Sequence, residues 1–200
     1  NRTKYSQGIL PIDTYKRDID EFLGTELHYD WEALRAEIKE HGLRHSTLSA
    51  QMPSESSSVA SNETNGIEPP RDLLSVKKSK KGTLKQIVPS YQSLKNYYTL
   101  LWDMKGNEGY IRIVAAMQKY FDQAISGNWS YNPLQFANNE VPLSVMLKDL
   151  LTTYKYGWKT SYYQNTYDMK SDDEVQVPVI VEQPIQQTVE QEEQCDACAI

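Results

Sequence analysis

Cysteine is nearly absent from this 200-residue chain, and the two that occur, Cys195 and Cys198, lie among the last six residues. A secreted disulfide scaffold spreads its cysteines through the folded body, so that class is excluded. Long hydrophobic runs are also lacking, because no stretch approaches the ~18 apolar residues that a membrane-spanning helix needs. The N-terminus carries no signal-peptide pattern. We therefore expect a cytoplasmic protein without a membrane partner.

Positive charge is missing from the end of the chain. Residues 171–200 contain eight acidic side chains and no Lys or Arg, while the net charge of the whole chain is −6, so the preceding residues are close to neutral. No broad basic surface for nucleic acid is indicated. Hydrophobic periodicity ends near Asp168, and we expect residues 169–200 to form a flexible, disordered acidic tail.

Helical patterns dominate residues 1–168. We expect Asp13 to cap a first helix that runs to Leu23, and Asp30 to cap a second that stops at Gly42. Further helices are expected over about 90–103 and from about 110 to near 127. A last helix starts near Pro142 and has the clearest amphipathic face of the chain, formed by Leu143, Met146, Leu147, Leu150, Leu151 and Tyr154.

Strand signals are fewer. A short semi-apolar run covers 46–52, and residues 73–88 are typical of a hairpin that turns at Lys81-Gly82. Residues 159–164 form the last expected strand.

Two polar segments are candidate sites. In MPSESSSVASN, residues 52–62, serine hydroxyls and the start of a following helix could hold an anion such as phosphate, although spacing alone favours a surface loop with a helix cap. CDAC, at 195–198, lacks the further ligands that zinc needs, so no metal site is expected. A mobile thiol pair fits a redox shuttle, and the alternative is a pair of idle thiols.

Two tyrosines, Tyr162 and Tyr163, are adjacent on the last expected strand. Neighbouring side chains of a strand point to opposite faces, so one phenol could face an interior cavity and the other an interface. A phenol is neutral near pH 7, and its oxidation to a neutral radical removes a proton and an electron together. Two phenols in contact could pass such a radical between them, but on these residues alone simple packing is the favoured interpretation.

Taken together, several segments resemble the C-terminal part of the large, catalytic subunit of class Ia ribonucleoside-diphosphate reductases. They are PIDTY (11–15), LHYDWEALR (27–35), HGLRHSTLSAQMPSESSS (41–58), SNETNGIEPPR (61–71), LLWDMKGNEGY (101–110), LKDLLTTYKYGWKTSYYQNT (147–166) and the terminal cysteine pair. The resemblance implies a helix-rich α/β fold, the C-terminal part of a ten-stranded α/β barrel over 1–168. It would include the last barrel strands near 46–52 and 159–164, with a hairpin and helical subdomain over about 71–158.

The resemblance also implies roles for individual residues. The substrate-phosphate loop would comprise Ser54, Glu55, Ser56 and Ser57, with Ser56 standing where the family has Thr. Tyr162 and Tyr163 would relay a radical toward a barrel cysteine. Cys195 and Cys198 would re-reduce an active-site disulfide and be reduced in turn by thioredoxin or glutaredoxin.

The implied partners are a ribonucleoside diphosphate substrate, the remainder of the large subunit and a radical-generating small subunit that holds a di-iron tyrosyl radical. No cofactor is expected on this chain itself, and allosteric nucleotides would bind outside it. The thiyl-forming cysteine and its companions would lie upstream, so the chain alone should not turn over, whether it is a fragment or one half of a split enzyme. The competing interpretation is a non-catalytic helical interaction module with an acidic, thiol-bearing tail.

Overall fold

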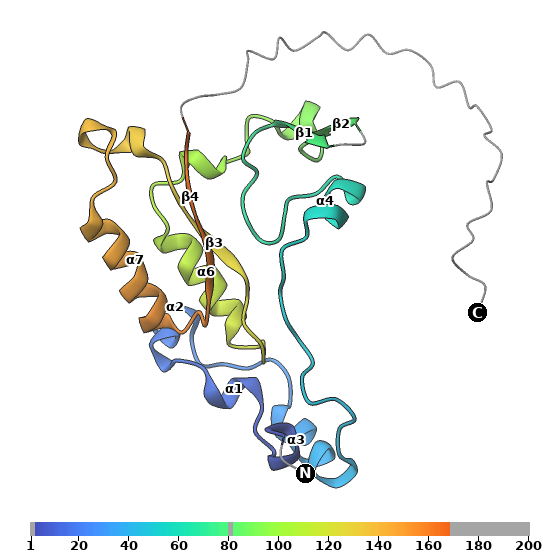
Figure 1. Cartoon of the computed structure of the whole chain (residues 1–200). Coiled ribbons are helices and arrows are strands. Elements are labelled where there is room, and N and C mark those ends of the chain that lie inside the picture. The colour runs from blue at the N-terminus through green and yellow to red at the C-terminus, as the bar shows by residue number, and fades with distance from the viewer. Residues whose placement is uncertain (1–2, 80–81, 169–200) are drawn as a thin grey trace, which may run out of the picture. The chain divides into compact units, whose positions relative to one another are not determined.

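The computed structural model describes residues 3–79 and 82–168 (Figure 1), and they form a helix-rich α/β structure with short strands. The strands make two separate two-stranded sheets, an antiparallel β1–β2 pair and a parallel β3–β4 pair. In chain order the elements are η1 (Tyr5–Gln7), α1 (Pro11–Thr14), η2 (Arg17–Ile19), α2 (Asp20–Leu23), α3 (Trp31–His41), α4 (Glu55–Ser61), β1 (Leu74–Ser79), β2 (Gly82–Ile87), α5 (Tyr91–Leu94), η3 (Leu101–Asp103), α6 (Glu108–Gln118), β3 (Gly127–Tyr131), η4 (Pro133–Gln135), η5 (Ala137–Asn139), α7 (Leu143–Tyr156) and β4 (Ser161–Thr166).

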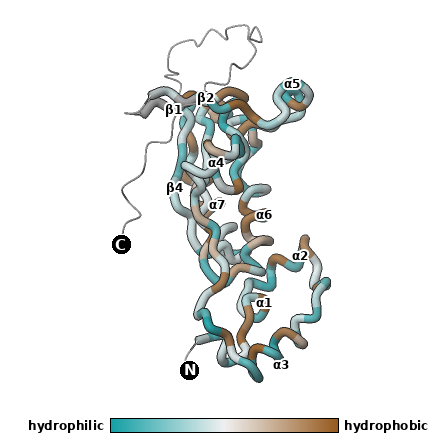
Figure 2. Tube along the Cα trace, turned by 90° about the vertical axis from the view of Figure 1, so that its right-hand side faces the viewer, coloured by the Kyte–Doolittle hydropathy of each residue, from teal (hydrophilic) through white to brown (hydrophobic). Residues whose placement is uncertain are grey.

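The core is built around α6, whose hydrophobic residues stand out in Figure 2. Ile111 and Val114 on this helix are fully buried, and they cluster with Ile125 and Trp158. The Trp158 indole N–H donates to the carbonyl of Ile125 at 2.7 Å, which satisfies the one polar atom of the ring. This cluster holds the segment before β3 and the segment before β4 against the same helix.

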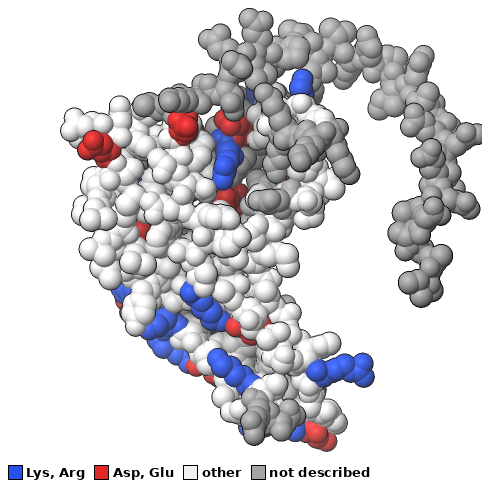
Figure 3. Space-filling view, viewed as in Figure 1, with Lys and Arg blue, Asp and Glu red and all other residues white. Residues whose placement is uncertain are grey.

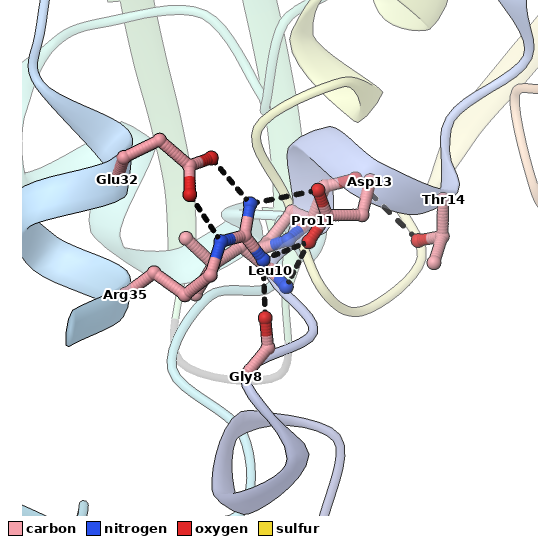
Figure 4. Close-up of polar contacts among 7 residues, drawn as sticks. All are labelled: Gly8, Leu10, Pro11, Asp13, Thr14, Glu32 and Arg35. Carbon is pink, nitrogen blue, oxygen red and sulfur yellow. Dashed lines mark hydrogen bonds and ion pairs between the residues drawn. The ribbon is translucent and has the colours of Figure 1, made fainter. Parts of the chain in front are cut away.

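The expected helix from Asp13 to Leu23 is wrong, because the segment breaks into α1, η2 and α2. Asp13 lies inside α1, where its carboxylate accepts from the Leu10 amide at 2.7 Å and from the Arg35 guanidinium at 2.6 and 2.9 Å (Figure 4). Arg35 also donates to Glu32 and to the Gly8 carbonyl. Asp13 therefore caps α1 from its first turn, through the Leu10 amide, and pairs with Arg35 of α3 as well, instead of standing before one long helix.

The second expected helix is confirmed as α3. Its N-cap Asp30 accepts from the Ala33 amide at 2.9 Å, and it ends at Gly42, whose φ of 77° is a conformation that glycine adopts without strain. Both ends are set by local chemistry, which is why the sequence located them.

The amphipathic face of α7 points away from the core. Leu143 is 78% exposed, Leu147 52% and Leu151 59%. The part of the surface over this helix carries few charged groups in Figure 3. The amphipathic pattern normally marks the side that faces the core, so this apolar face has no cover among the residues that the structure describes.

The buried side of α7 is polar instead. Asp149 is 5% exposed, and its Oδ2 accepts from Asn107 Nδ2 at 2.8 Å and from the Tyr131 hydroxyl at 3.0 Å. Asn107 in turn accepts from the Ser130 amide at 2.9 Å. These bonds join α7, the start of α6 and strand β3 through a single buried carboxylate.

The expected hairpin is confirmed as β1 and β2, with Leu74 opposite Ile87 and Ser79 opposite Gly82. The turn itself, at residues 80–81, lies outside the described residues.

The helix expected over 90–103 is wrong. Only α5 and the turn η3 form there, because the Leu101 amide donates to the Pro70 carbonyl at 2.9 Å instead of to a preceding helical turn.

The helix expected to run from about 110 to near 127 ends at Gln118 and is followed by strand β3, which the sequence did not predict. The Gln118 side chain donates to the Phe121 and Gln123 carbonyls at 3.2 and 2.8 Å and accepts from the Ile125 amide at 3.2 Å. One buried amide side chain thus replaces the helical bonds over the turn into β3.

The strand expected at 46–52 forms only one isolated parallel bridge, Gln51 to Ile125. The amides of Leu48 and Ser49 donate to the Asp122 carboxylate at 2.6 and 3.1 Å, which takes them out of any ladder. Although burial acts to raise the pKa of Asp122, hydrogen bonds from Leu48 and Tyr5 outweigh it, and the pKa is lowered.

The last expected strand is confirmed as β4, two residues further along than predicted. No helix in the described part of the chain is long and apolar enough to cross a bilayer.

Candidate functional site

Tyr162 and Tyr163 lie on β4 with their rings in contact. The ring centroids are 4.2 Å apart and the ring planes meet at 60°. The two residues are 51% and 60% exposed. Within the part of the chain that the structure describes, neither phenol therefore faces an interior cavity, and the two rings are in contact.

A β-bulge explains how adjacent residues bring their rings together. Gly127 of β3 pairs with Ser161 of β4, and the next pair is Trp129 with Gln164. Between these pairs Asn128 alone stands opposite two residues, Tyr162 and Tyr163. An extra residue of this kind breaks the strict alternation of side chains along a strand and bends it.

The side chain of Asn128 fills the gap that the bulge leaves in the ladder. Its Oδ1 accepts from the Tyr163 amide at 2.9 Å, and its Nδ2 donates to Glu68 Oε1. Burial raises the pKa of Glu68, and the hydrogen bond from Asn128 opposes that rise. Burial and the nearby Glu68 charge also raise the pKa of Tyr110.

The proposed phosphate loop forms the start of helix α4. Ser54 is the N-cap residue, so the amides of the next three residues have no acceptor within the helix. Ser56 and Ser57 are exposed. The backbone of Glu55 begins the helix. A helix start with serine hydroxyls can bind an anion, so this geometry is compatible with the phosphate-binding role that the resemblance implies.

Both ends of α4 are fastened by side chains from elsewhere. The Ser54 amide donates to Asn65 Oδ1 at 2.7 Å. At the other end, Gln86 Nε2 on β2 donates to the carbonyls of Ser58 and Glu63 at 3.0 and 2.6 Å. The predicted hairpin thus supports the serine loop.

The loop that joins α4 to β1 contacts both candidate sites. Asn65 holds the serine loop, and Glu68, three residues later, holds Asn128 and through it Tyr163. The sequence interpretation did not identify these three polar residues as functional. Asn65 and Glu68 do lie in NGIEPPR, one of the segments on which the family resemblance rests, whereas nothing near Asn128 in the sequence marks it.

Cys195 and Cys198, like the whole expected acidic tail, lie outside the described residues. Within 3–79 and 82–168, no three His, Cys, Asp or Glu side chains converge as metal ligands would.

Comparison with known proteins assigns a class to this arrangement. The family model for the ribonucleotide reductase barrel domain matches residues 1–95 and 89–164. The chain therefore belongs to the ribonucleotide reductase barrel-domain family.

Individual relatives narrow the similarity to one type of subunit. The chain is 59% identical over 172 residues to the alpha subunit of ribonucleoside-diphosphate reductase 1 of Escherichia coli K12, a match that covers 86% of the chain and 23% of the relative. Identity to the alpha subunit of Haemophilus influenzae is also 59%, with the same coverage. The alpha subunit of enterobacteria phage T4 is 44% identical over 177 residues, covering 88% of the chain and 24% of the relative. The chain thus spans about a quarter of the length of these relatives.

Proposed function

We propose that this chain is the C-terminal portion of the large subunit of a ribonucleoside-diphosphate reductase, which makes deoxyribonucleoside diphosphates by radical chemistry in the cytoplasm. In this proposal the chain supplies three parts: the loop at Ser54, Glu55, Ser56 and Ser57 for substrate phosphates, the Tyr162–Tyr163 pair for radical transfer, and the Cys195–Cys198 pair for reducing equivalents.

The contact between the two phenol rings is the observation that carries the proposal. When one tyrosine of the pair is a neutral radical, the other can pass it a hydrogen atom, that is, one electron and one proton. The first ring then regains its O–H bond and the second becomes the radical. A centroid separation of 4.2 Å suits this exchange, and exposure of both rings leaves them open to partners on either side.

Other groups complete the chemistry. The barrel cysteine that would receive the radical belongs to the remainder of the large subunit, and the radical would originate in a di-iron small subunit. Replacing the ribose hydroxyl by hydrogen consumes two electrons and two protons and releases water, and a dithiol in the remainder of the large subunit would supply them while it becomes a disulfide. Cys195 and Cys198 would reduce that disulfide by thiol exchange and become a disulfide themselves. Thioredoxin or glutaredoxin would then reduce the Cys195–Cys198 disulfide by thiol exchange.

The phenol hydroxyls are tested by replacing Tyr162 or Tyr163 with Phe in the assembled enzyme, which contains this chain, the remainder of the large subunit and the small subunit. Each replacement should abolish turnover while substrate affinity stays unchanged, because Phe keeps the ring but has no O–H to lose. Tyr97→Phe is the matched control, since Tyr97 is 81% exposed and lies on another segment. Retained turnover in Tyr162→Phe and Tyr163→Phe would contradict the radical role.

The dithiol is tested separately. Cys195→Ser or Cys198→Ser should block turnover driven by thioredoxin and spare turnover driven by dithiothreitol, which reaches the active-site disulfide without a shuttle. Equal loss with both reductants would argue against a shuttle. A non-catalytic helical interaction module predicts no dependence of any activity on these hydroxyls or thiols, so the two experiments also separate that alternative from the reductase.

A further inference from the structure

We propose that Asn128 and Glu68 act together as positioning residues that keep Tyr162 and Tyr163 in ring contact by holding the bulge of β4 open. This inference rests on the proposed radical role of the tyrosine pair. It adds two residues, from β3 and from the loop before β1, that touch neither substrate nor the reacting phenol oxygens.

The bulge needs an acceptor that the strand ladder does not supply. In a regular parallel pair, ladder carbonyls accept from the backbone amides of the neighbouring strand. At this bulge two β4 residues face one β3 residue, and Tyr163 directs its amide to the side chain of Asn128, at 2.9 Å from Oδ1. This bond ties the backbone of β4 to β3 at the point where the ladder has no pairing of its own, so it favours the bulged register over a regular one.

Glu68 fixes which way the Asn128 amide points. An ionised carboxylate only accepts hydrogen bonds, so it must face the NH₂ group of Asn128, and the oxygen of Asn128 is then turned to the Tyr163 amide. Glu68 itself lies in a loop that is held at both sides. Ile67 packs against the main core, and the Pro70 carbonyl accepts from the Leu101 amide at 2.9 Å.

Strand β3 is a rigid base for this contact. On either side of Asn128, Gly127 packs closely against the Tyr110 hydroxyl and the Trp158 ring, and the Trp129 indole N–H donates to the Thr153 hydroxyl at 3.3 Å. The Asn128 side chain therefore leaves a strand that cannot easily follow a shift of β4. Loss of the contact should move Tyr162 and Tyr163 relative to each other rather than carry both strands along.

A charge-swap experiment in the assembled enzyme tests the pair. Asn128→Asp places a carboxylate against Glu68, and the two negative groups repel each other. Glu68→Gln can donate as well as accept, so it loosens the orientation of the Asn128 amide without adding charge, and it should lower kcat by less than Asn128→Asp does. The double variant Asn128→Asp/Glu68→Gln exchanges amide and carboxylate between the two positions, so an acceptor for the Tyr163 amide and the bond between the two side chains are both restored. Asn96→Asp, on the exposed turn after α5, adds the same charge elsewhere.

We expect Asn128→Asp to lower kcat about 10- to 100-fold, the range that a displacement near 1 Å causes, with KM for the substrate unchanged. The double variant should recover to within about 3-fold of the parent, on that same scale. The yield of an aminotyrosyl radical at position 162, measured by electron paramagnetic resonance with 3-aminotyrosine placed there, should fall and recover in parallel. A purely structural role would lower active-site content and leave the radical yield per active site unchanged.

Two results would overturn the inference: Asn128→Asp turning over as well as Asn96→Asp, or the double variant remaining as slow as Asn128→Asp. If Asn128→Asp fails to assemble, Asn128→Ala decides, because it removes the acceptor without adding charge and should show the same loss of kcat and radical yield. Failure of the underlying function is distinguished by Tyr162→Phe. Turnover in that variant refutes the relay itself, whereas a dead Tyr162→Phe beside an active Asn128→Asp refutes only the positioning role.

Discussion

Replacing the buried carboxylate of α7 should destabilise the chain strongly. In Asp149→Ala, two donors at the interface of α7, α6 and β3 lose their acceptor, namely Asn107 Nδ2 and the Tyr131 hydroxyl, which lie 2.8 and 3.0 Å from Asp149 Oδ2. An unpaired buried donor costs about 1–3 kcal/mol. The two together should lower the free energy of unfolding by about 2–6 kcal/mol, a large share of the roughly 5–15 kcal/mol that a typical domain has.

The measurement is urea unfolding followed by tryptophan fluorescence, since Trp129 and Trp158 both lie in or against the core. Asp149→Asn, which keeps one acceptor oxygen, should cost less than Asp149→Ala. Asp18→Ala, at an exposed position, should change stability by no more than about 0.5 kcal/mol. If Asp149→Ala is as stable as Asp18→Ala, then this side of α7 is not buried, and the polar contacts assigned to it do not exist.

Three further outcomes follow from the packing and charges. Gly127→Ala should lower the free energy of unfolding by about 1–3 kcal/mol, because the new Cβ would lie 2.6 Å from the Tyr110 hydroxyl oxygen and 2.8 Å from the Trp158 ring. Gly109→Ala in α6 is the control, because nothing lies within 4 Å of its new Cβ. Equal stability of the two variants would refute the close contact of Gly127. Leu151→Glu on the outer face of α7 should lower the free energy of unfolding by less than about 0.5 kcal/mol in the same assay. Ile111→Ala, in the core, should lower it by about 2–5 kcal/mol. A large loss of stability in Leu151→Glu would show that this face is covered. Arg35 holds the pKa of Asp13 below its ordinary value, so their ion pair stabilises the fold above about pH 4, and this stabilisation is lost as the pH falls below it. Arg35→Met should therefore reduce the loss of stability on acidification. An unchanged dependence of stability on pH would contradict the pairing.

Sequence patterns located the elements whose ends are set locally. Helix α3 was predicted with both caps because Asp30 and Gly42 act within one turn of the helix. The start of α7 at Leu143 follows from Pro142 in the same way. The orientation of α7 could not be predicted, because Asp149 and Thr153 find their partners far away in the chain, at Asn107, Tyr131 and Trp129.

The candidate residues lie in short local motifs, the serine loop and the tyrosine doublet, but only the resemblance to a family favoured a functional interpretation of them over a loop and simple packing. The contact between the tyrosine rings was not predictable, because it depends on the register between β4 and a strand more than thirty positions earlier. Strand β3 itself was missed, since Gly127 and Asn128 are poor strand formers and the Gln118 side chain, rather than a turn motif, ends the preceding helix.

Tyr162 and Tyr163 are adjacent in the sequence, but their rings lie side by side only because β4 carries one extra residue at the bulge. Deleting a single residue of β4 next to the doublet would let the ladder close regularly, and the alternation of the strand would then send consecutive side chains to opposite sides. Placing two adjacent tyrosines on another, regular strand would likewise not bring their rings into contact. The feature that evolution or a designer has to preserve is therefore a count of residues between Ser161 and Gln164 as much as the identity of the two that lie there.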